Sequence, residues 1–196
     1  MARGRPRKFD EQQALAAAVT VFREHGYRGT SMQMLSEAMG MGEQSIYNAF
    51  GTKDQLYGAA LAHYCDHDAS AALRSLEAPD AALAAIHAFF VGLVDRLAQP
   101  EGAAPCMVLE DHVRPATDNE VARERSSQHM RRVERAFLRA LERARSQAQL
   151  ELEDPRTMAR YLLVSMQGLA VIARSDVPRR ALRKIVNQIL APLRAS

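Results

Sequence analysis

The sequence predicts an all-α protein of about nine helices. Alanine and leucine, both strong helix formers, account for 34 and 20 of the 196 residues. The β-branched residues that favour strands are fewer, with 12 valines, 5 isoleucines and 5 threonines. Seven of the ten glycines lie at or before position 58, and seven of the eight prolines lie at or after position 79. This division predicts short glycine-capped helices first and longer proline-bounded helices after them.

Capping residues place the first two helices. Asp10 is expected to cap a helix that carries an apolar stripe and ends at Gly26. A second helix is expected to begin at Thr30 and Ser31, with Gln33 completing a capping box from Thr30.

Glycines and a second capping box place the next two. The second helix is expected to end at Gly40, and a third to cover residues 42–50 and stop at Gly51. Thr52 with Gln55 predicts the start of a longer fourth helix that reaches position 76.

Five helices are predicted beyond the fourth, over residues 81–97, 105–114, 118–149, 155–174 and 178–193. The last is amphipathic, and the one before it is apolar nearly all round. Because the last helix can cover only one side of its neighbour, a second copy of the chain is expected to cover the other. The sequence therefore predicts a homodimer through residues 155–174 and 178–193.

Composition excludes several protein classes. No apolar run approaches the roughly 20 residues that span a bilayer, which predicts a cytoplasmic protein with no membrane partner. Two cysteines without CxxC spacing argue against a disulfide scaffold and a cysteine zinc site. No catalytic or metal-binding motif is visible, so we expect no enzyme activity, no cofactor and no metal.

The two short helices around Gly40-Met41-Gly42 predict a helix-turn-helix, in which the second helix enters the DNA major groove. Ile46, Ala49 and Phe50 are expected to face inward. The expected contacts with bases or phosphates are Gln44, Ser45, Tyr47 and Asn48 on the second helix, with Thr30, Ser31 and Lys53 at helix starts.

A basic arm precedes the first helix. The net charge is +3, yet the first nine residues hold four basic groups and no acidic one, namely Arg3, Arg5, Arg7 and Lys8. The other 187 residues hold 22 basic and 23 acidic groups (26 − 4 = 22). Residues 3–6 resemble the core of an AT-hook, which predicts minor-groove contact; a solvated tail that attracts DNA without specificity is the alternative.

Segments 22–31, 38–40 and 45–56 follow the patterns F-x-x-x-G-Y-x-x-T-S, A-x-G and S-[LI]-Y-x-x-F-x-[ST]-K-x-x-L. With these motifs the chain resembles the TetR family of bacterial transcriptional regulators. After the basic arm at 1–9, the resemblance implies a DNA-binding domain at 10–55 and an effector-binding and dimerisation domain at 56–196. It also implies that the protein is a transcriptional regulator, expected to be a repressor. A small apolar or electrophilic effector is expected to release it from a palindromic double-stranded DNA operator.

The resemblance also implies an effector pocket behind the fourth helix. The residues that could line or orient it are Tyr64, His67, Phe89, Phe90, Cys106, Met107, Glu110, His112 and Met166. For any one of them ordinary core packing is the alternative, and Cys106 is either a reactive sensor or an inert core thiol. The rival function is an all-helical binding protein or enzyme that does not bind DNA.

Overall fold

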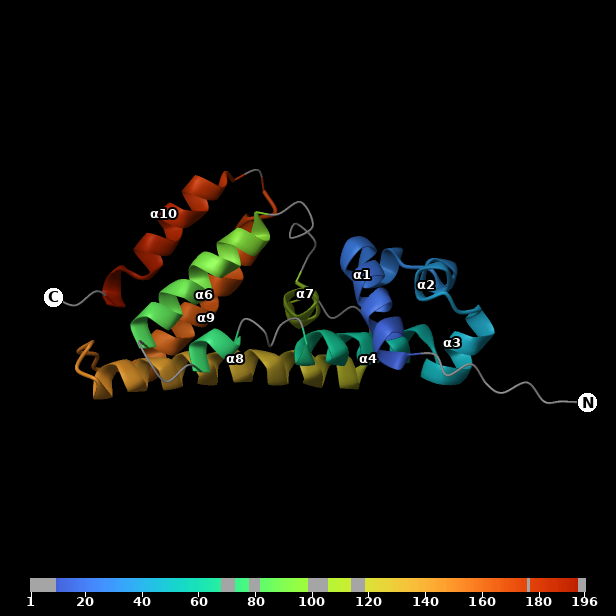
Figure 1. The fold of residues 1–196 in the computed structure, drawn as a ribbon, viewed down its shortest axis with the longest axis horizontal. Coiled ribbons are helices and arrows are strands. Elements are labelled where there is room, and N and C mark those ends of the chain that lie inside the picture. Colours follow the sequence, from blue (N-terminus) through green and yellow to red (C-terminus); the bar gives the residue numbers. More distant parts are fainter. Residues whose placement is uncertain are drawn as a thin grey trace, which may run out of the picture.

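A computed structural model describes residues 10–67, 73–77, 82–98, 106–113, 119–175 and 177–193. Within these ranges the chain forms nine α-helices and no β-strand (Figure 1). They are α1 (Glu11–Gly29), α2 (Met32–Met39), α3 (Glu43–Phe50), α4 (Lys53–Asp66), α6 (Ala82–Leu97), α7 (Met107–Val113), α8 (Glu120–Ser146), α9 (Pro155–Ile172) and α10 (Arg179–Ile189). Two 3-10 helices, η1 (Ser75–Glu77) and η3 (Ala191–Leu193), complete the order. The all-α prediction is confirmed.

Helix α8 runs along most of the molecule and organises the rest (Figure 1). We call α1, α2 and α3 the head; they gather at one end of the long axis. We call α6 to α10 the body, of which α6, α9 and α10 gather at the other end. Helix α4 packs against both α1 and α8 and so joins the head to the body.

Two apolar clusters fill the interior. The body cluster is built around three aromatic rings, with Phe137 at ring-centroid distances of 5.1 Å from Phe89 and 5.8 Å from Phe90. The second cluster runs from Leu35 and Ile46 in the head along α4 to α7 and the first half of α8. Apolar packing therefore continues from the head into the body without a break at α4.

The start of α2 differs from the prediction by one residue. Ser31, and not Thr30, is the N-cap, and its hydroxyl accepts from the Met34 amide at 3.1 Å. Thr30 is buried, and its hydroxyl donates to the Gly26 carbonyl at 2.7 Å. The predicted capping box from Thr30 is therefore wrong, because tertiary burial uses its hydroxyl elsewhere.

Helix α4 is shorter than predicted. Its capping box forms as expected, with Thr52 and Gln55 each accepting a backbone amide of the other. The helix ends at Asp66 and does not continue to position 76. Asp66 favours an end here, because aspartate is a weak helix former and is unfavourable at the negative end of the helix dipole.

Helix α9 leaves much of its apolar surface uncovered in the single chain. Ala159, Leu162 and Leu169 are buried against the body. Val164 and Val171, which lie seven residues apart on the opposite face, are 65% and 57% exposed. None of the helices in the described ranges is long and apolar enough to cross a membrane.

Candidate nucleic-acid interface and pocket residues

Helix α3 presents a polar face and buries one apolar anchor. The predicted contact residues Gln44, Ser45, Tyr47 and Asn48 are all exposed. The Gln44 side-chain amide donates to the Asn48 side-chain oxygen at 3.2 Å, so these two groups share one edge of the helix. Ile46 is fully buried, whereas Ala49, predicted to face inward, is exposed. The small side chain of Ala49 lets another molecule come close to this exposed edge of α3.

The turn between α2 and α3 is fixed by one glycine and one serine. Gly40 adopts φ 63° and ψ 28°, a left-handed conformation that glycine reaches without steric cost. The Met41 amide donates to the Ser36 carbonyl at 3.1 Å, and the Ser36 hydroxyl donates to the Met41 carbonyl at 2.6 Å. These bonds set the angle between the two helices of the helix-turn-helix.

The predicted phosphate contacts at the start of α2 are reduced to one. Ser31 is exposed, and its hydroxyl caps the helix. Because Thr30 is only 3% exposed and its hydroxyl is bonded to Gly26, that hydroxyl is not available to a phosphate, which corrects the prediction for Thr30. The predicted arm residues Arg3, Arg5, Arg7 and Lys8 lie outside the described ranges.

Lys53 is held in place by an aromatic ring that the sequence reasoning missed. Its ammonium nitrogen lies 4.3 Å from the centroid of the Tyr27 ring, and partial burial lowers the pKa of Lys53. The Tyr27 hydroxyl donates to the Asp54 carboxylate. Tyr27 thus ties the end of α1 to the first turn of α4 and orients a cation beside the α3 face. In the sequence, the aromatic residue directly after Gly26 could have indicated this role, because Gly26 interrupts the helical conformation of α1.

Gly51 explains why α3 and α4 can meet so tightly. It adopts φ 78°, which disfavours other residues, and its amide donates to the Tyr47 carbonyl at 3.0 Å. A Cβ at this position would lie 1.9 Å from the Gln55 side-chain oxygen. Any side chain at Gly51 would therefore displace the capping box of α4.

The predicted pocket residues fall into two groups. Tyr64, Cys106, Met107 and Met166 pack in the cluster that runs along α4 and α7. Phe89 and Phe90 are buried in the body cluster against Phe137 and fill that core, which corrects their assignment to a cavity. Met166 also packs on the body cluster and lies between the groups.

Two predicted histidines differ from the rest. His67 is exposed at the end of α4, where its ring lies 4.4 Å from the ring of His63, so it does not line an apolar cavity. The backbone of His112 belongs to α7, and its side chain lies outside the described part of the structure.

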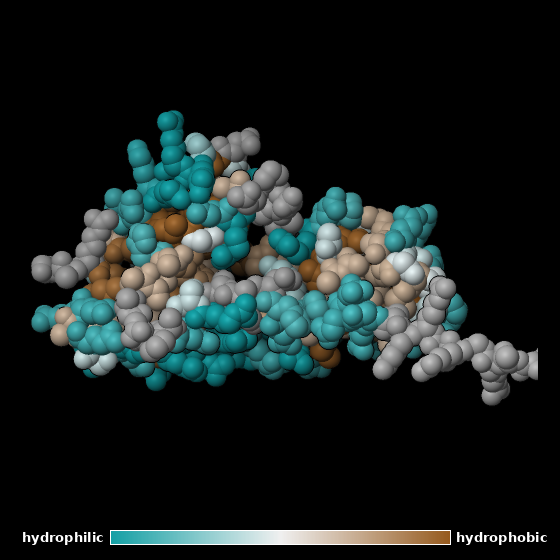
Figure 2. Space-filling model, in the orientation of Figure 1, coloured by the Kyte–Doolittle hydropathy of each residue, from teal (hydrophilic) through white to brown (hydrophobic). Residues whose placement is uncertain are grey.

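A cleft of about 480 Å³ opens between the end of α1, α4, α7 and the end of α9. Figure 2 shows the molecule hollowed between its two ends on this face. Of the predicted pocket residues, Met107 and Glu110 line the cleft. Glu110 pairs with Arg174 beyond the end of α9. Burial and the neighbouring Asp111 raise the pKa of the Tyr57 hydroxyl, which keeps it protonated.

The two cysteines lie in different surroundings. Cys65 is buried, and burial, followed by the charges of Asp66 and Cys106, raises the pKa of its thiol to about 12. Cys106 is partly exposed at the start of α7, and the Tyr64 hydroxyl donates to its sulfur at 3.9 Å.

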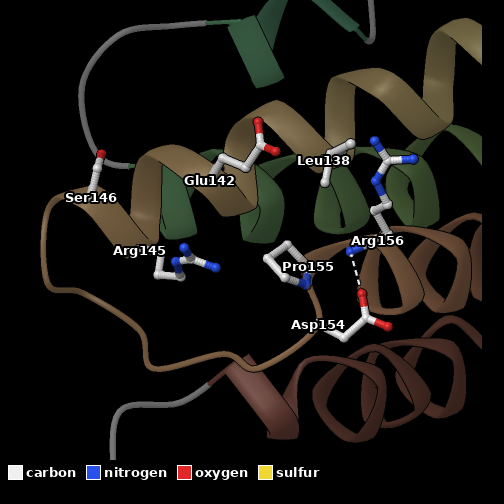
Figure 3. A pocket seen from close by; sticks show the side chains of 7 residues that line it. All are labelled: Leu138, Glu142, Arg145, Ser146, Asp154, Pro155 and Arg156. Atoms are coloured by element: carbon white, nitrogen blue, oxygen red, sulfur yellow. Dashed lines mark hydrogen bonds between the residues drawn. The ribbon is translucent and has the colours of Figure 1, made fainter.

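A separate hollow of about 390 Å³ lies where α8 turns back into α9 (Figure 3). It includes no predicted site residue. Asp154 caps α9 there by accepting from the Arg156 amide at 3.0 Å, and polar side chains form most of the rim. This hollow is a surface junction between two helices.

The model of the bacterial regulatory proteins of the tetR family matches residues 14–60. The chain is 35% identical to the uncharacterized HTH-type transcriptional regulator YezE of Bacillus subtilis (strain 168), over 97% of this chain and 99% of that protein. The chain belongs to the TetR family. This membership agrees with the prediction of a transcriptional regulator and not an enzyme.

Two further relatives cover this TetR-family chain almost completely. The HTH-type transcriptional repressor ComR of Escherichia coli (strain K12) is 26% identical over 96% of this chain and 90% of its own length. A cysteine mutant of the TetR-family regulator CifR, solved with a 26-bp double-strand operator DNA, is 30% identical. Its structure matches with a TM-score of 0.84 over 95% of this chain and 98% of that one.

Proposed function

We propose that this regulator binds a palindromic DNA operator as a homodimer and represses transcription until a small apolar or electrophilic effector releases it. The exposed polar edge of α3 carries the proposal. Gln44 and Asn48 can pair with adenine in the major groove, while Ser45, Tyr47, Ser31 and Lys53 contact phosphates or bases. The basic arm adds contacts beside the helix-turn-helix. The CifR relative bound to operator DNA supports this choice.

The dimer is formed by α9 and α10. In the single chain α9 exposes Tyr161, Val164, Val171 and Ile172, by 40% to 65%. Gly168 lies among them, and a Cβ there would meet nothing within 4 Å. An apolar face with a small residue at its centre lets the same helix of a second copy approach closely. A partner that covers α9 places two α3 helices on one DNA duplex.

The effector acts where α4, α7 and α9 meet. Tyr64, Cys106, Met107 and Met166 share one apolar cluster there, and the cleft beside Glu110 gives access from solvent. An effector that separates α7 from α4 favours a spacing of the two α3 helices that does not match successive major grooves. DNA is then released by a shift in population between the two spacings.

A gel-shift titration on the DNA upstream of the protein's own gene tests this function. The wild type is expected to bind with an affinity that falls steeply with salt. Gln44→Ala is expected to weaken binding about tenfold, and Gln128→Ala, at an exposed glutamine of α8, to leave it unchanged. Absence of salt-dependent binding by the wild type would exclude the function. Repeating the titration with a panel of apolar and electrophilic compounds tests release.

A further inference from the structure

One side chain of the body holds the first turn of α4. The Asn119 side-chain amide donates to the Asp54 backbone carbonyl at 2.6 Å, across 65 positions of the sequence. Its side-chain oxygen accepts from the Val121 and Ala122 amides, at 3.0 and 3.2 Å, and so caps α8. A helix carbonyl has a second lone pair, so the Asp54 oxygen can accept this bond without leaving α4.

Gly58 makes this contact possible. It is buried in the middle of α4, one helical turn after Asp54, where a glycine weakens a helix relative to alanine. A Cβ on Gly58 would lie 3.2 Å from the Asn119 amide nitrogen. Because Gly58 has no side chain, Asn119 has room to reach the Asp54 carbonyl. This explains why a glycine lies in the middle of α4.

The contact lies next to the residues that orient the DNA-facing cation. Asp54 accepts from the Tyr27 hydroxyl, and the Tyr27 ring holds the ammonium group of Lys53. A continuous series of contacts thus runs from α8 through Asn119 and Asp54 to the end of α1. Helix α7, which carries Met107, ends at Val113, and α8 begins at Glu120, so six residues separate the two helices.

We propose that Asn119 is a positioning residue that couples the body to the head. While its amide holds the Asp54 carbonyl, α4 keeps a fixed angle to α8, and the two heads of a dimer keep the separation that fits the operator. Breaking the bond widens the range of separations and lowers the fraction of dimers ready to bind. This inference rests on the proposed DNA-binding function.

Asn119→Asp separates the coupling from the cap. Aspartate keeps the acceptor oxygen that caps α8 but has no amide to donate to Asp54. We expect this variant to fold, with a thermal midpoint lowered by about 2 to 4 °C because one part-buried hydrogen bond is lost, and to bind a palindromic site about tenfold more weakly. Gln128→Glu, at an exposed position of α8 away from α3 and from the proposed dimer interface, is the control for the added negative charge.

Binding to a single half-site distinguishes coupling from other causes. We expect half-site affinity to match the wild type in Asn119→Asp. An equal loss on half-site and palindrome would overturn the proposal, because it would mean that the head itself or its charge had changed. Wild-type affinity for the palindrome would also overturn it.

Gly58→Ala gives an independent variant. It improves the helix propensity of α4 and crowds Asn119, so we expect an equal or higher thermal midpoint together with weaker palindrome binding. Unchanged palindrome binding by this variant would contradict the proposal. Amide hydrogen exchange needs no DNA: in Asn119→Asp the Gly58 amide, whose helical acceptor is the Asp54 carbonyl, should exchange faster while α2 and α9 keep their rates. If the wild type binds no DNA but the exchange result is obtained, the operator function fails and the physical contact stands; unchanged exchange overturns the contact itself.

Discussion

The head and the body keep their helices in place by different means. In the head, short helices meet at turns that individual residues define, such as Gly40 and Gly51, and the Thr52 capping box fixes the start of α4, where the head ends. In the body, longer helices are held by apolar packing around Phe137. The head is therefore most sensitive to single backbone and capping changes, and the body to the volume of its core. A surface that contacts DNA needs fixed angles between its helices. A region for dimerisation and effector binding needs packed helix faces that can shift.

The largest effect is expected in the body core. Phe137→Ala removes a fully buried ring and should lower the free energy of unfolding by about 3 to 5 kcal/mol in urea denaturation. Phe50→Ala, which removes a half-buried ring of α3, is the matched change in the head and should cost less. Equal costs at the two sites would remove the distinction between the regions.

The next effect concerns the exposed face of α9. Val164→Glu should weaken the dimer about 100-fold in analytical ultracentrifugation, because a charge would be buried in an apolar interface. Val121→Glu makes the same change on α8, where Val121 is 61% exposed, and should leave the dimer intact. Dissociation by both variants, or by neither, would argue against α9 as the interface.

The sequence predicts a structural feature well when the residues that create it are close together in the sequence. Asp10, Gly40 and Thr52 act within a few residues, so their helix ends could be predicted locally. Thr30 and Ser31 offer adjacent hydroxyls, and only the burial of Thr30 decides that Ser31 is the cap.

The body depends on partners distant in the sequence. Aromatic residues at helical spacing look the same in a cavity wall and in a core; Phe89 and Phe90 are core residues because Phe137 of α8 packs on them. The Asn119 contact with Asp54 likewise joins residues that no local pattern relates. The exposed face of α9 can be predicted locally, because a helix that is apolar nearly all round needs partners on two sides.

A smaller effect tests the capping box at the start of α4, where the head ends. Thr52→Ala removes the hydroxyl that accepts from the Gln55 amide and should cost about 1 kcal/mol of unfolding free energy. Thr20→Ala is the control: Thr20 is exposed within α1 and donates only back to the Ala16 carbonyl, so alanine should be neutral or stabilising there. A loss from Thr20→Ala as large as that from Thr52→Ala would contradict the capping argument.

The smallest effect tests a surface clamp of the body. Asp95 on α6 accepts from Arg179 and Arg183 of α10, and these hydrogen bonds lower its pKa. Because its folded-state pKa lies below the unfolded value, the clamp stabilises the fold above the usual aspartate pKa and is lost as pH falls through the folded-state pKa. Asp95→Asn should flatten the acid side of the stability profile slightly, as measured by urea denaturation at a series of pH values. An unchanged profile would show that the clamp contributes nothing.

Selection of binding sites from a pool of random DNA duplexes tests the central claim most directly. A dimer that presents two α3 helices to one face of the duplex should enrich a palindrome whose half-sites are centred about 10 bp, or a multiple of it, apart. The variant with Gln44 and Asn48 both replaced by alanine should lose this enrichment while remaining folded and dimeric. Enrichment of an unpaired site, or enrichment that survives the loss of both side chains, would contradict the account.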